Sequence, residues 1–145
     1  MKIKTLELID ATLDWAVCIA QGIKPEDIYI QKWGSLKASL FRRNRDEDGE
    51  LDGSYTTGPD LLFSRKWESG GPIIEREGID LYCNVPTNPA HKDPSWRGSW
   101  RAKYHRCGYG TDMSHGPTPL IAAMRCYVAS KLGDEVEIPN ELIGE

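Results

Sequence analysis

The sequence predicts an α+β domain in which two helices, one near each end of the chain, pack on an antiparallel sheet of short strands. Two observations predict this class: apolar residues recur with helical spacing near both termini, and apolar and polar residues alternate in the middle. Because the strands are not separated by helices as in β-α-β units, the sheet is expected to be antiparallel. A length of 145 residues suits one core, so we expect a single domain over residues 1–145.

The first helix is expected from Ala11 to Gln21, with Asp10 as its N-cap and Gly22 as a left-handed stop. Three- and four-residue spacing places several apolar residues on one face, namely Leu13, Ala16, Val17 and Ala20. Trp15 and Cys18 widen that face. The helix should therefore bury one stripe in the core.

Short strands are expected in the middle of the chain. Ile28 and Ile30 alternate with polar residues, and SLKASLF is expected to continue as another strand. In GIDLYCNV, residues 78–85, one face carries Ile79, Leu81, Cys83 and Val85. In SWRAKYHR, one face carries Trp100, Ala102 and Tyr104, and the other carries Arg101, Lys103 and His105. We expect these last two strands to pair antiparallel.

The last helix is expected from Pro119 to about Leu132, with Thr118 as N-cap and Gly133 as the C-terminal stop. Its buried stripe is expected to consist of Leu120, Ala123, Met124, Tyr127 and Val128, with Arg125 and Lys131 nearer solvent. VEIP then gives one more short extended segment.

Two stretches have the composition of irregular insertions. Residues 42–53, RRNRDEDGELDG, are charged and glycine-rich and are expected to form a solvated, mobile loop. A calcium loop is disfavoured there because the glycines are misplaced and no closing glutamate follows. Residues 86–98 contain three prolines before Ser95 and are expected to form an irregular excursion.

Composition excludes several classes of function. The formal net charge of −4 gives no general attraction to nucleic acid, so direct nucleic-acid binding is not expected. No stretch has the length of a signal peptide or a membrane span, so a cytoplasmic protein without membrane contact is expected. Four cysteines without a CxxC pair suggest buried thiols rather than a metal site, and no cofactor is implied. No catalytic motif is present, so we expect a binding protein rather than an enzyme.

The stretch KWESGGPIIERE allows two interpretations. Gly70, Gly71 and Pro72 would form a tight turn leading into a strand. Alternatively, Trp67 would be a stacking platform beside exposed backbone amides, with Arg65, Lys66 or Arg76 as charge partners. The second arrangement would suit a base and a phosphate.

The stretch DPSWRGSWRAKYHR interleaves aromatic and basic residues. From Lys92 to Arg106 there are five basic residues and one acidic residue, so the segment carries +4 in a chain of −4. Aromatic rings stack on bases and guanidinium groups bind phosphates, so Trp100 and Arg101 are candidate ligand residues. The alternative is a strand whose tryptophans face the core and whose arginines are solvated.

The stretch GPTP precedes the last helix. The first amides of a helix lack partners and lie at the positive end of its dipole, so Gly116 and Thr118 could contribute to an anion site. The alternative is a well-defined N-cap without a ligand.

Three stretches of this chain, LELIDATLDWAV, KWESGGPIIEREGI and GPTPLIAAMRCYVASKLGDEVEIP, together resemble the NinX family of small phage and prophage proteins. The resemblance covers both ends and the centre but not residues 42–53 or 86–98, which look like variable insertions. It implies a phage-encoded accessory protein acting in the bacterial cytoplasm, and it carries no reaction or cofactor.

The leading hypothesis is a phage accessory protein that binds a small anionic ligand, best fitted by a nucleotide, and sequesters a host anti-phage defence signal. The candidate ligand residues are Trp67, Gly70, Gly71, Arg76, Trp100, Arg101, Gly116 and Thr118. The alternative is an interaction module that binds a host protein through the acidic loop and exposed tryptophans. A homo-oligomer is expected in either case, with Trp15 or a tryptophan of the basic strand at its interface.

Overall fold

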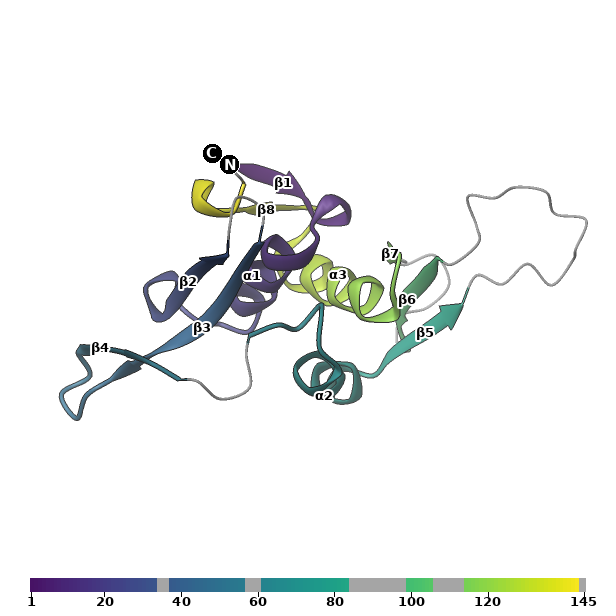
Figure 1. The fold of residues 1–145 in the computed structure, drawn as a ribbon. Coiled ribbons are helices and arrows are strands. Elements are labelled where there is room, and N and C mark those ends of the chain that lie inside the picture. The colour runs from purple at the N-terminus through teal and green to yellow at the C-terminus, as the bar shows by residue number, and fades with distance from the viewer. Residues whose placement is uncertain (34–36, 57–60, 84–98, 106–113, 144–145) are drawn as a thin grey trace, which may run out of the picture.

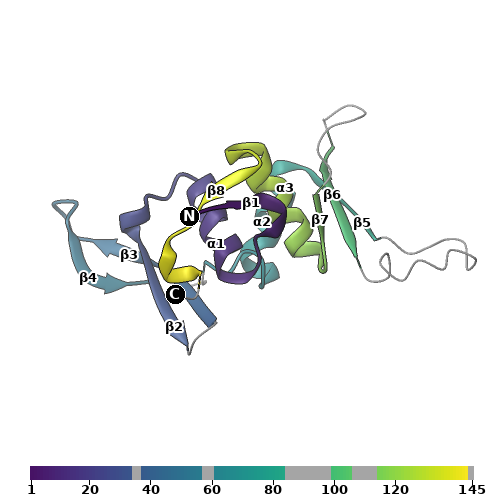
Figure 2. The same cartoon turned by 90° about the horizontal axis from the view of Figure 1, so that it is seen from above.

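Two central helices organise the molecule. The computed structural model describes residues 1–33, 37–56, 61–83, 99–105 and 114–143. Helices α1 (Asp10–Ala20) and α3 (Pro119–Leu132) pack against each other, and a three-stranded sheet lies beyond each of them (Figures 1 and 2). The α+β class is confirmed. The expectation of one sheet and two helices is incomplete, because the described ranges contain three antiparallel sheets and three α helices.

Helix α1 starts one residue earlier than expected. Its N-cap is the extended Ile9, and Asp10, expected as the cap, is the first helical residue with a φ of 50°. The Thr12 hydroxyl accepts a 3.1 Å hydrogen bond from the Ile9 amide and donates a 2.7 Å bond to the Ile9 carbonyl. The Thr12 hydroxyl therefore binds the backbone of the N-cap residue, and the capping bond expected from the Asp10 side chain is not made. Gly22, at φ 85°, ends the helix as expected.

Helix α3 has the expected boundaries. The Thr118 hydroxyl accepts a 3.2 Å hydrogen bond from the Ile121 amide, and Gly133 stops the helix at φ 90°. The expected stripe is buried, but so are Ile121, Ala122 and Cys126, so the helix is covered on nearly every side. Arg125 is not free in solvent: its guanidinium donates to the carbonyls of Leu8 at 2.9 Å and His115 at 2.8 Å.

The stretch expected to be a tight turn is a helix. Helix α2 (Trp67–Glu77) runs through Gly70, Gly71 and Pro72 and ends at the left-handed Gly78. The prediction of a tight turn with exposed backbone amides is therefore wrong. A proline normally disfavours helical geometry in the preceding residue because its Cδ meets that residue's Cβ. Gly71 has no Cβ, so the helix can continue into Pro72.

The charged stretch forms a β-hairpin rather than a mobile loop. Strands β2 (Ile28–Trp33), β3 (Lys37–Arg45) and β4 (Leu51–Tyr55) form one antiparallel sheet. Residues 46–50 form the turn of the hairpin between β3 and β4. The Asp46 carboxylate accepts from the amides of Asp48 and Glu50, at 3.0 and 2.9 Å, and fixes that turn. The hairpin projects as an arm at one end of the molecule (Figures 1 and 2).

The second sheet confirms the predicted strand pair. Strands β5 (Ile79–Cys83) and β6 (Trp100–Tyr104) pair antiparallel, and β7 (Ser114–Gly116) adds to β6. Ala102 is fully buried against α3, whereas Cys83, the last residue of β5, is exposed rather than buried as expected. Val85 and residues 86–98 lie outside the described ranges.

The remaining elements close the fold near the two ends of the chain. Strand β1 (Lys2–Lys4) pairs antiparallel with β8 (Glu135–Glu137), which is the predicted extended VEIP segment. Single 3-10 turns occur at Thr5–Glu7, Pro25–Asp27 and Asn140–Leu142. Across the described ranges, no helix is both long and apolar enough to cross a membrane.

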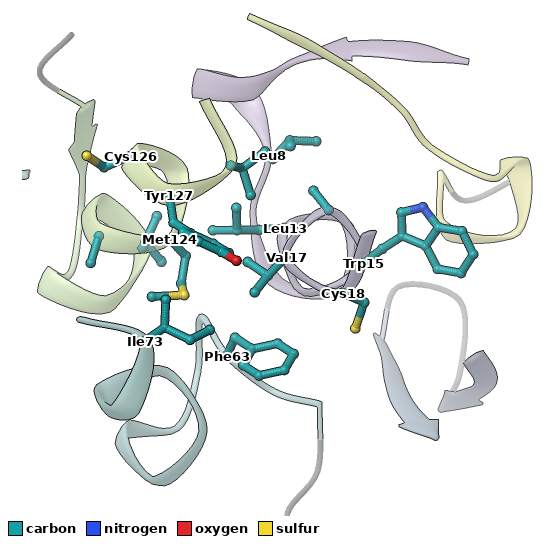
Figure 3. Close-up of a cluster of buried hydrophobic side chains, with 14 of the residues drawn as sticks. Leu8, Leu13, Trp15, Val17, Cys18, Phe63, Ile73, Met124, Cys126 and Tyr127 are labelled. Atoms are coloured by element: carbon teal, nitrogen blue, oxygen red, sulfur yellow. The ribbon is translucent and has the colours of Figure 1, made fainter. Parts of the chain in front are cut away.

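The core lies where the three helices meet. Leu13 and Val17 of α1, Ile73 of α2, and Met124 and Tyr127 of α3 converge there (Figure 3). Cys18 and Cys126 are buried, as expected, whereas Cys107 lies outside the described ranges. Trp15 is only 8% exposed, so most of this indole is packed inside the chain and little of it is left for the expected interface with another copy.

Candidate functional site

A small pocket joins two of the predicted site residues. It has a volume of about 290 Å³ and is lined by Asp10, Ser64, Arg65, Trp67, Thr118, Pro119, Leu120 and Ile121. Trp67 and Thr118 are 51 positions apart in the sequence and meet here because α2 packs on α3. The pocket is therefore a product of tertiary packing.

All three helices begin at this pocket. Asp10 is the first residue of α1, Trp67 is the first residue of α2, and Pro119 is the first residue of α3. Each helix N-terminus carries the positive end of a dipole, equivalent to about half an elementary charge. Three such ends around one small space favour a negative charge within it.

The acidic residues near these N-termini are unevenly distributed. Helix α1 has Asp10 in its first turn and α2 has Glu68, whereas the first turn of α3 has no acidic residue. The dipoles of α1 and α2 are thus partly compensated by carboxylates of the chain. The N-terminus of α3 is the uncompensated one.

One backbone amide at the start of α3 has no hydrogen-bond acceptor among the described residues. The Ile121 amide donates to the Thr118 hydroxyl and the Ala122 amide donates to the Thr118 carbonyl. Pro119 has no amide hydrogen. That amide belongs to Leu120, which has no hydrogen-bond acceptor for it in the described ranges and which lines the pocket.

Trp67 forms the exposed wall of the pocket. Its side chain is 54% exposed although it is one of the largest apolar groups of the chain. Being the first residue of α2, it is held by the helix and by the segment that precedes it. An exposed indole beside a small pocket has the geometry of a stacking surface for a planar ring.

Arg65 is anchored behind Trp67 by a buried carboxylate. Asp14, which is completely buried in α1, accepts from Nε and Nη2 of Arg65 at 3.0 and 2.9 Å. Asp14 also accepts from the Ser64 amide at 2.7 Å and the Ser64 hydroxyl at 2.6 Å. Burial raises the pKa of Asp14, and the bonds from Ser64 and the charge of Arg65 oppose that rise.

The same cluster links three parts of the fold. Nη2 of Arg65 also donates to the Ala38 carbonyl of β3 at 2.9 Å. This cluster thus connects α1, the segment before α2 and the sheet β2–β3–β4, which carries the arm and is called the arm sheet. Arg65 was predicted only as a charge partner, and Asp14 and Ser64 were not predicted as site residues. The available signal was Asp14 itself, a carboxylate between the apolar residues Leu13 and Trp15.

The predicted glycines have packing roles. A Cβ on Gly70 would lie 2.2 Å from the Phe63 carbonyl oxygen and 2.8 Å from Leu120 Cδ2. A Cβ on Gly116 would lie 2.7 Å from the Ala122 nitrogen and 2.9 Å from Ile121 Cγ2. Both glycines permit close contact with α3. Their presence is therefore explained without a ligand, and neither they nor Gly71 lines the pocket.

Three other predicted residues lie away from the pocket. Arg76 is in the last turn of α2, about 13 Å along the helix from Trp67, and its Nε is 3.1 Å from a Glu77 carboxylate oxygen. Trp100 is half-buried on the face of β6 that packs against α3. Arg101 lies on the opposite face of that strand.

Two larger hollows contain none of the predicted site residues. One of about 600 Å³ is lined by residues of β1, the 3-10 turn after it and α3, and one of about 410 Å³ lies between Trp15 and Pro139. In the described part of the chain, no group of three or more histidine, cysteine, aspartate or glutamate side chains is placed to hold a metal ion.

Comparison with known proteins gives one family. A search of curated proteins returns no match for this chain. The family model described as bacteriophage P22 NinX matches residues 4–131, which include α1, α2, α3 up to its last residue, the arm and every residue that lines the pocket. The chain therefore belongs to the NinX family of phage accessory proteins.

Proposed function

We propose that this phage protein binds a small anionic ligand, best fitted by a nucleotide, in the pocket where the three helices begin. The observation that carries the proposal is the convergence of Asp10, Trp67 and Pro119, the first residues of α1, α2 and α3. Helix N-termini attract anions through their unpaired amides and their dipoles. A binding role is preferred to catalysis because neither described histidine, His105 or His115, lines the pocket.

The phosphate would lie at the N-terminus of α3. There the Leu120 amide has no hydrogen-bond acceptor in the described ranges, and no acidic residue occupies the first turn. Arg65 lines the same pocket, and its bonds to Asp14 and Ala38 use Nε and Nη2, which leaves Nη1 to donate to a phosphate. Asp10 opposes the anion, so its carboxylate should limit affinity rather than create it.

The base would stack on Trp67. Stacking of a base on an aromatic side chain contributes about 1–3 kcal/mol. The pocket volume of about 290 Å³ lies at the lower end of the range of roughly 300–1,000 Å³ usual for ligand pockets. One nucleotide fits that size better than a dinucleotide. Capture of such a ligand in the host cytoplasm would remove a defence signal, and a homo-oligomer would increase the number of sites.

Thermal shift measurements test the proposal. The protein is melted alone and with each member of a panel of linear and cyclic mononucleotides, and one member should raise the melting temperature. Trp67→Ala should abolish that shift. Leu6→Ala is the matched control because Leu6 is also 54% exposed and lies outside this pocket, so it should keep the shift.

Asp10→Asn distinguishes an anion from other ligands. Removal of the carboxylate should tighten binding of a nucleotide phosphate, because like charges near the site no longer repel. Asparagine tolerates the left-handed φ of 50° at this position as well as aspartate does. Weaker binding in Asp10→Asn, or no shift with any nucleotide, would contradict the proposal.

A host protein as ligand is the second candidate, and the projecting arm favours it. The hairpin turn presents Asp46, Glu47, Asp48 and Glu50 at the end of an arm that stands away from the helices (Figure 1). An acidic turn at the end of a projecting arm suits a basic surface on another protein. If one host protein co-purifies with the wild type but not with a variant that has these four residues changed to Asn or Gln, while no nucleotide shifts the melt, the second candidate is favoured.

A further inference from the structure

The outer face of the sheet β5–β6–β7 carries a row of aromatic and cationic side chains. In this antiparallel sheet Tyr82 of β5 is opposite Arg101 of β6, and Arg101 is opposite His115 of β7. Directly paired residues share a face, and their Cβ atoms lie about 5 Å apart. Because Ala102 is fully buried against α3, its neighbours Arg101 and Lys103 point to the opposite face.

Arg101 differs from most other arginines in the described ranges. Arg45, Arg65 and Arg76 are each paired with a carboxylate, and Arg125 donates to two carbonyls. Arg101 has no hydrogen-bond acceptor among the described residues. Its Nε is shielded from solvent and has no hydrogen-bond partner. Its charge is therefore not used to hold the fold together.

Lys103 and Tyr82 complete the face. The Lys103 ammonium lies 5.2 Å from the centre of the Tyr82 ring, and Tyr82 is 39% exposed. Asp80, an acidic residue of this face, is opposite Lys103 in the strand register and lies 2.9 Å from Nδ1 of His105. Arg101 and Lys103 thus stand beside an accessible ring, and Asp80 is opposite Lys103 rather than Arg101.

We infer that this face binds the sugar-phosphate backbone and bases of a single-stranded nucleic acid. Alternate residues of a strand are about 6.6 Å apart, so Arg101 and Lys103 can each meet a successive phosphate of an extended strand. Tyr82 offers a base an aromatic surface, and this combination of cations and rings is the usual one for single strands. The inference is independent of the nucleotide pocket, which neither Arg101 nor Lys103 lines.

The net charge of −4 sets the character of this binding. The rest of the chain repels a polyanion, so attraction arises only at the local face and depends strongly on salt. For single strands the logarithm of the affinity falls with the logarithm of the salt concentration, with a slope of about −0.7 per phosphate contact. Two contacts predict a slope of about −1.4, or about a sevenfold loss from 50 to 200 mM salt.

Fluorescence anisotropy of labelled oligo(dT) and oligo(rU), each about 12 nucleotides long, tests the inference with the full chain. The wild type should bind at low salt with the slope given above. Arg101→Gln and Lys103→Ala should each weaken binding and reduce the loss over that salt range to about two- to threefold. Tyr82→Ala should weaken binding without changing the slope.

Two control variants match these charge changes. Arg42→Gln removes another strand arginine whose side chain has no hydrogen-bond acceptor in the described ranges. Arg42 lies on β3 of the arm sheet, away from the face with Arg101. Lys131→Ala removes another lysine over a tyrosine ring, here 5.9 Å from the centre of Tyr127 in α3. Both controls should bind like the wild type, and so should Trp67→Ala.

Several results would overturn the inference. They are absence of binding to both oligonucleotides at low salt, equal loss of affinity in Arg42→Gln and Arg101→Gln, or stronger binding to oligo(dT) annealed to oligo(dA) than to oligo(dT) alone. Because Lys103→Ala changes a partly exposed position, it keeps the test decisive if Arg101→Gln fails to fold. Thermal melts of each variant identify that case.

Discussion

The hydroxyl of Ser64 donates a 2.6 Å hydrogen bond to the buried carboxylate of Asp14, which lies 50 positions earlier in the chain. The Ser64 amide and Arg65 donate to the same carboxylate. Asp14 therefore ties the segment that leads into α2 to helix α1. This contact fixes where Trp67 stands, and with it one wall of the candidate pocket.

Asp14→Ala should strongly destabilise the protein. It leaves Arg65, whose side chain is 28% exposed, and the buried Ser64 without their carboxylate, and breaking a buried pair in this way costs about 3–5 kcal/mol. Ser64→Ala removes one donor and should cost about 1 kcal/mol. The free energy of unfolding in urea measures both. Asp52→Ala, at a fully exposed carboxylate, should cost far less, and similar values for Asp14 and Asp52 would contradict the role assigned to Asp14.

Gly70→Ala should destabilise the packing of α2 on α3. The new methyl group would lie 2.2 Å from the Phe63 carbonyl oxygen, a backbone atom that cannot turn aside. Overpacking of this kind costs about 1–3 kcal/mol or more. The neighbouring Gly71→Ala is the matched control, because its Cβ would meet only Trp67 Cε3 at 3.8 Å.

For Gly71→Ala, the gain in helix propensity of about 1 kcal/mol opposes the restriction that Pro72 places on a preceding residue with a Cβ. Its net change in the free energy of unfolding should therefore be small. Urea titration of both variants checks the pair. A Gly70→Ala protein as stable as Gly71→Ala would show that the close contact with Phe63 is not a constraint.

Tyr104 should make the protein less stable at alkaline pH. Burial raises the pKa of Tyr104 to about 12 from the ordinary 10.0, although its hydroxyl shares a 2.9 Å hydrogen bond with Ser130. As pH rises from about 10 to about 12, the unfolded chain loses this proton and the folded chain keeps it, so stability falls. Below pH 10 the effect is absent.

Tyr104→Phe removes this titration. Its free energy of unfolding should decline less steeply between pH 10 and 12 than that of the wild type, as measured by urea titration at several pH values. Titration of tyrosinate absorbance should also lose one late-ionising group. Parallel pH profiles of the two proteins would contradict the assignment.

The arm should open independently of the core when its aromatic cluster is disrupted. Tyr29 and Tyr55 stack with ring centres 4.6 Å apart, and Phe41 lies 5.2 Å from Tyr55. Such ring pairs contribute about 0.5–1.5 kcal/mol each beyond buried area. In Tyr55→Ala, hydrogen exchange of the backbone amides that follow Arg43 in β3 should become faster, while the amides of α3 stay protected. Uniform acceleration in both regions would show that the arm and core unfold together.

Local sequence was sufficient for helices α1 and α3. Thr118, Pro119 and Gly133 define the ends of α3 through interactions with adjacent residues, and the apolar spacing of Leu13 and Val17 marks the buried side of α1. The strands β5 and β6 were predicted for the same reason, because alternation reveals a strand with one buried face. These features depend on neighbours within a few positions.

Helix α2 could not be predicted from local rules, since Gly70, Gly71 and Pro72 are individually unfavourable in a helix. Its spacing of Trp67, Gly70, Ile73 and Ile74 was the missed signal, together with the stop at Gly78. Burial of Ile73 against the other helices stabilises α2 and outweighs those preferences. The charged hairpin was missed for a related reason, because its aromatic stack joins residues from three strands.

The sequence by itself determined the class of the fold, the two terminal helices, the paired strands β5 and β6, and membership in the NinX family. Only the tertiary structure decided that Trp67 and Thr118 share a pocket and that Arg101 belongs to a different face. It also showed that Gly70 and Gly116 serve close packing on α3. The physical reason is that caps and periodicity act over a few residues, whereas a binding site depends on which distant surfaces burial brings together.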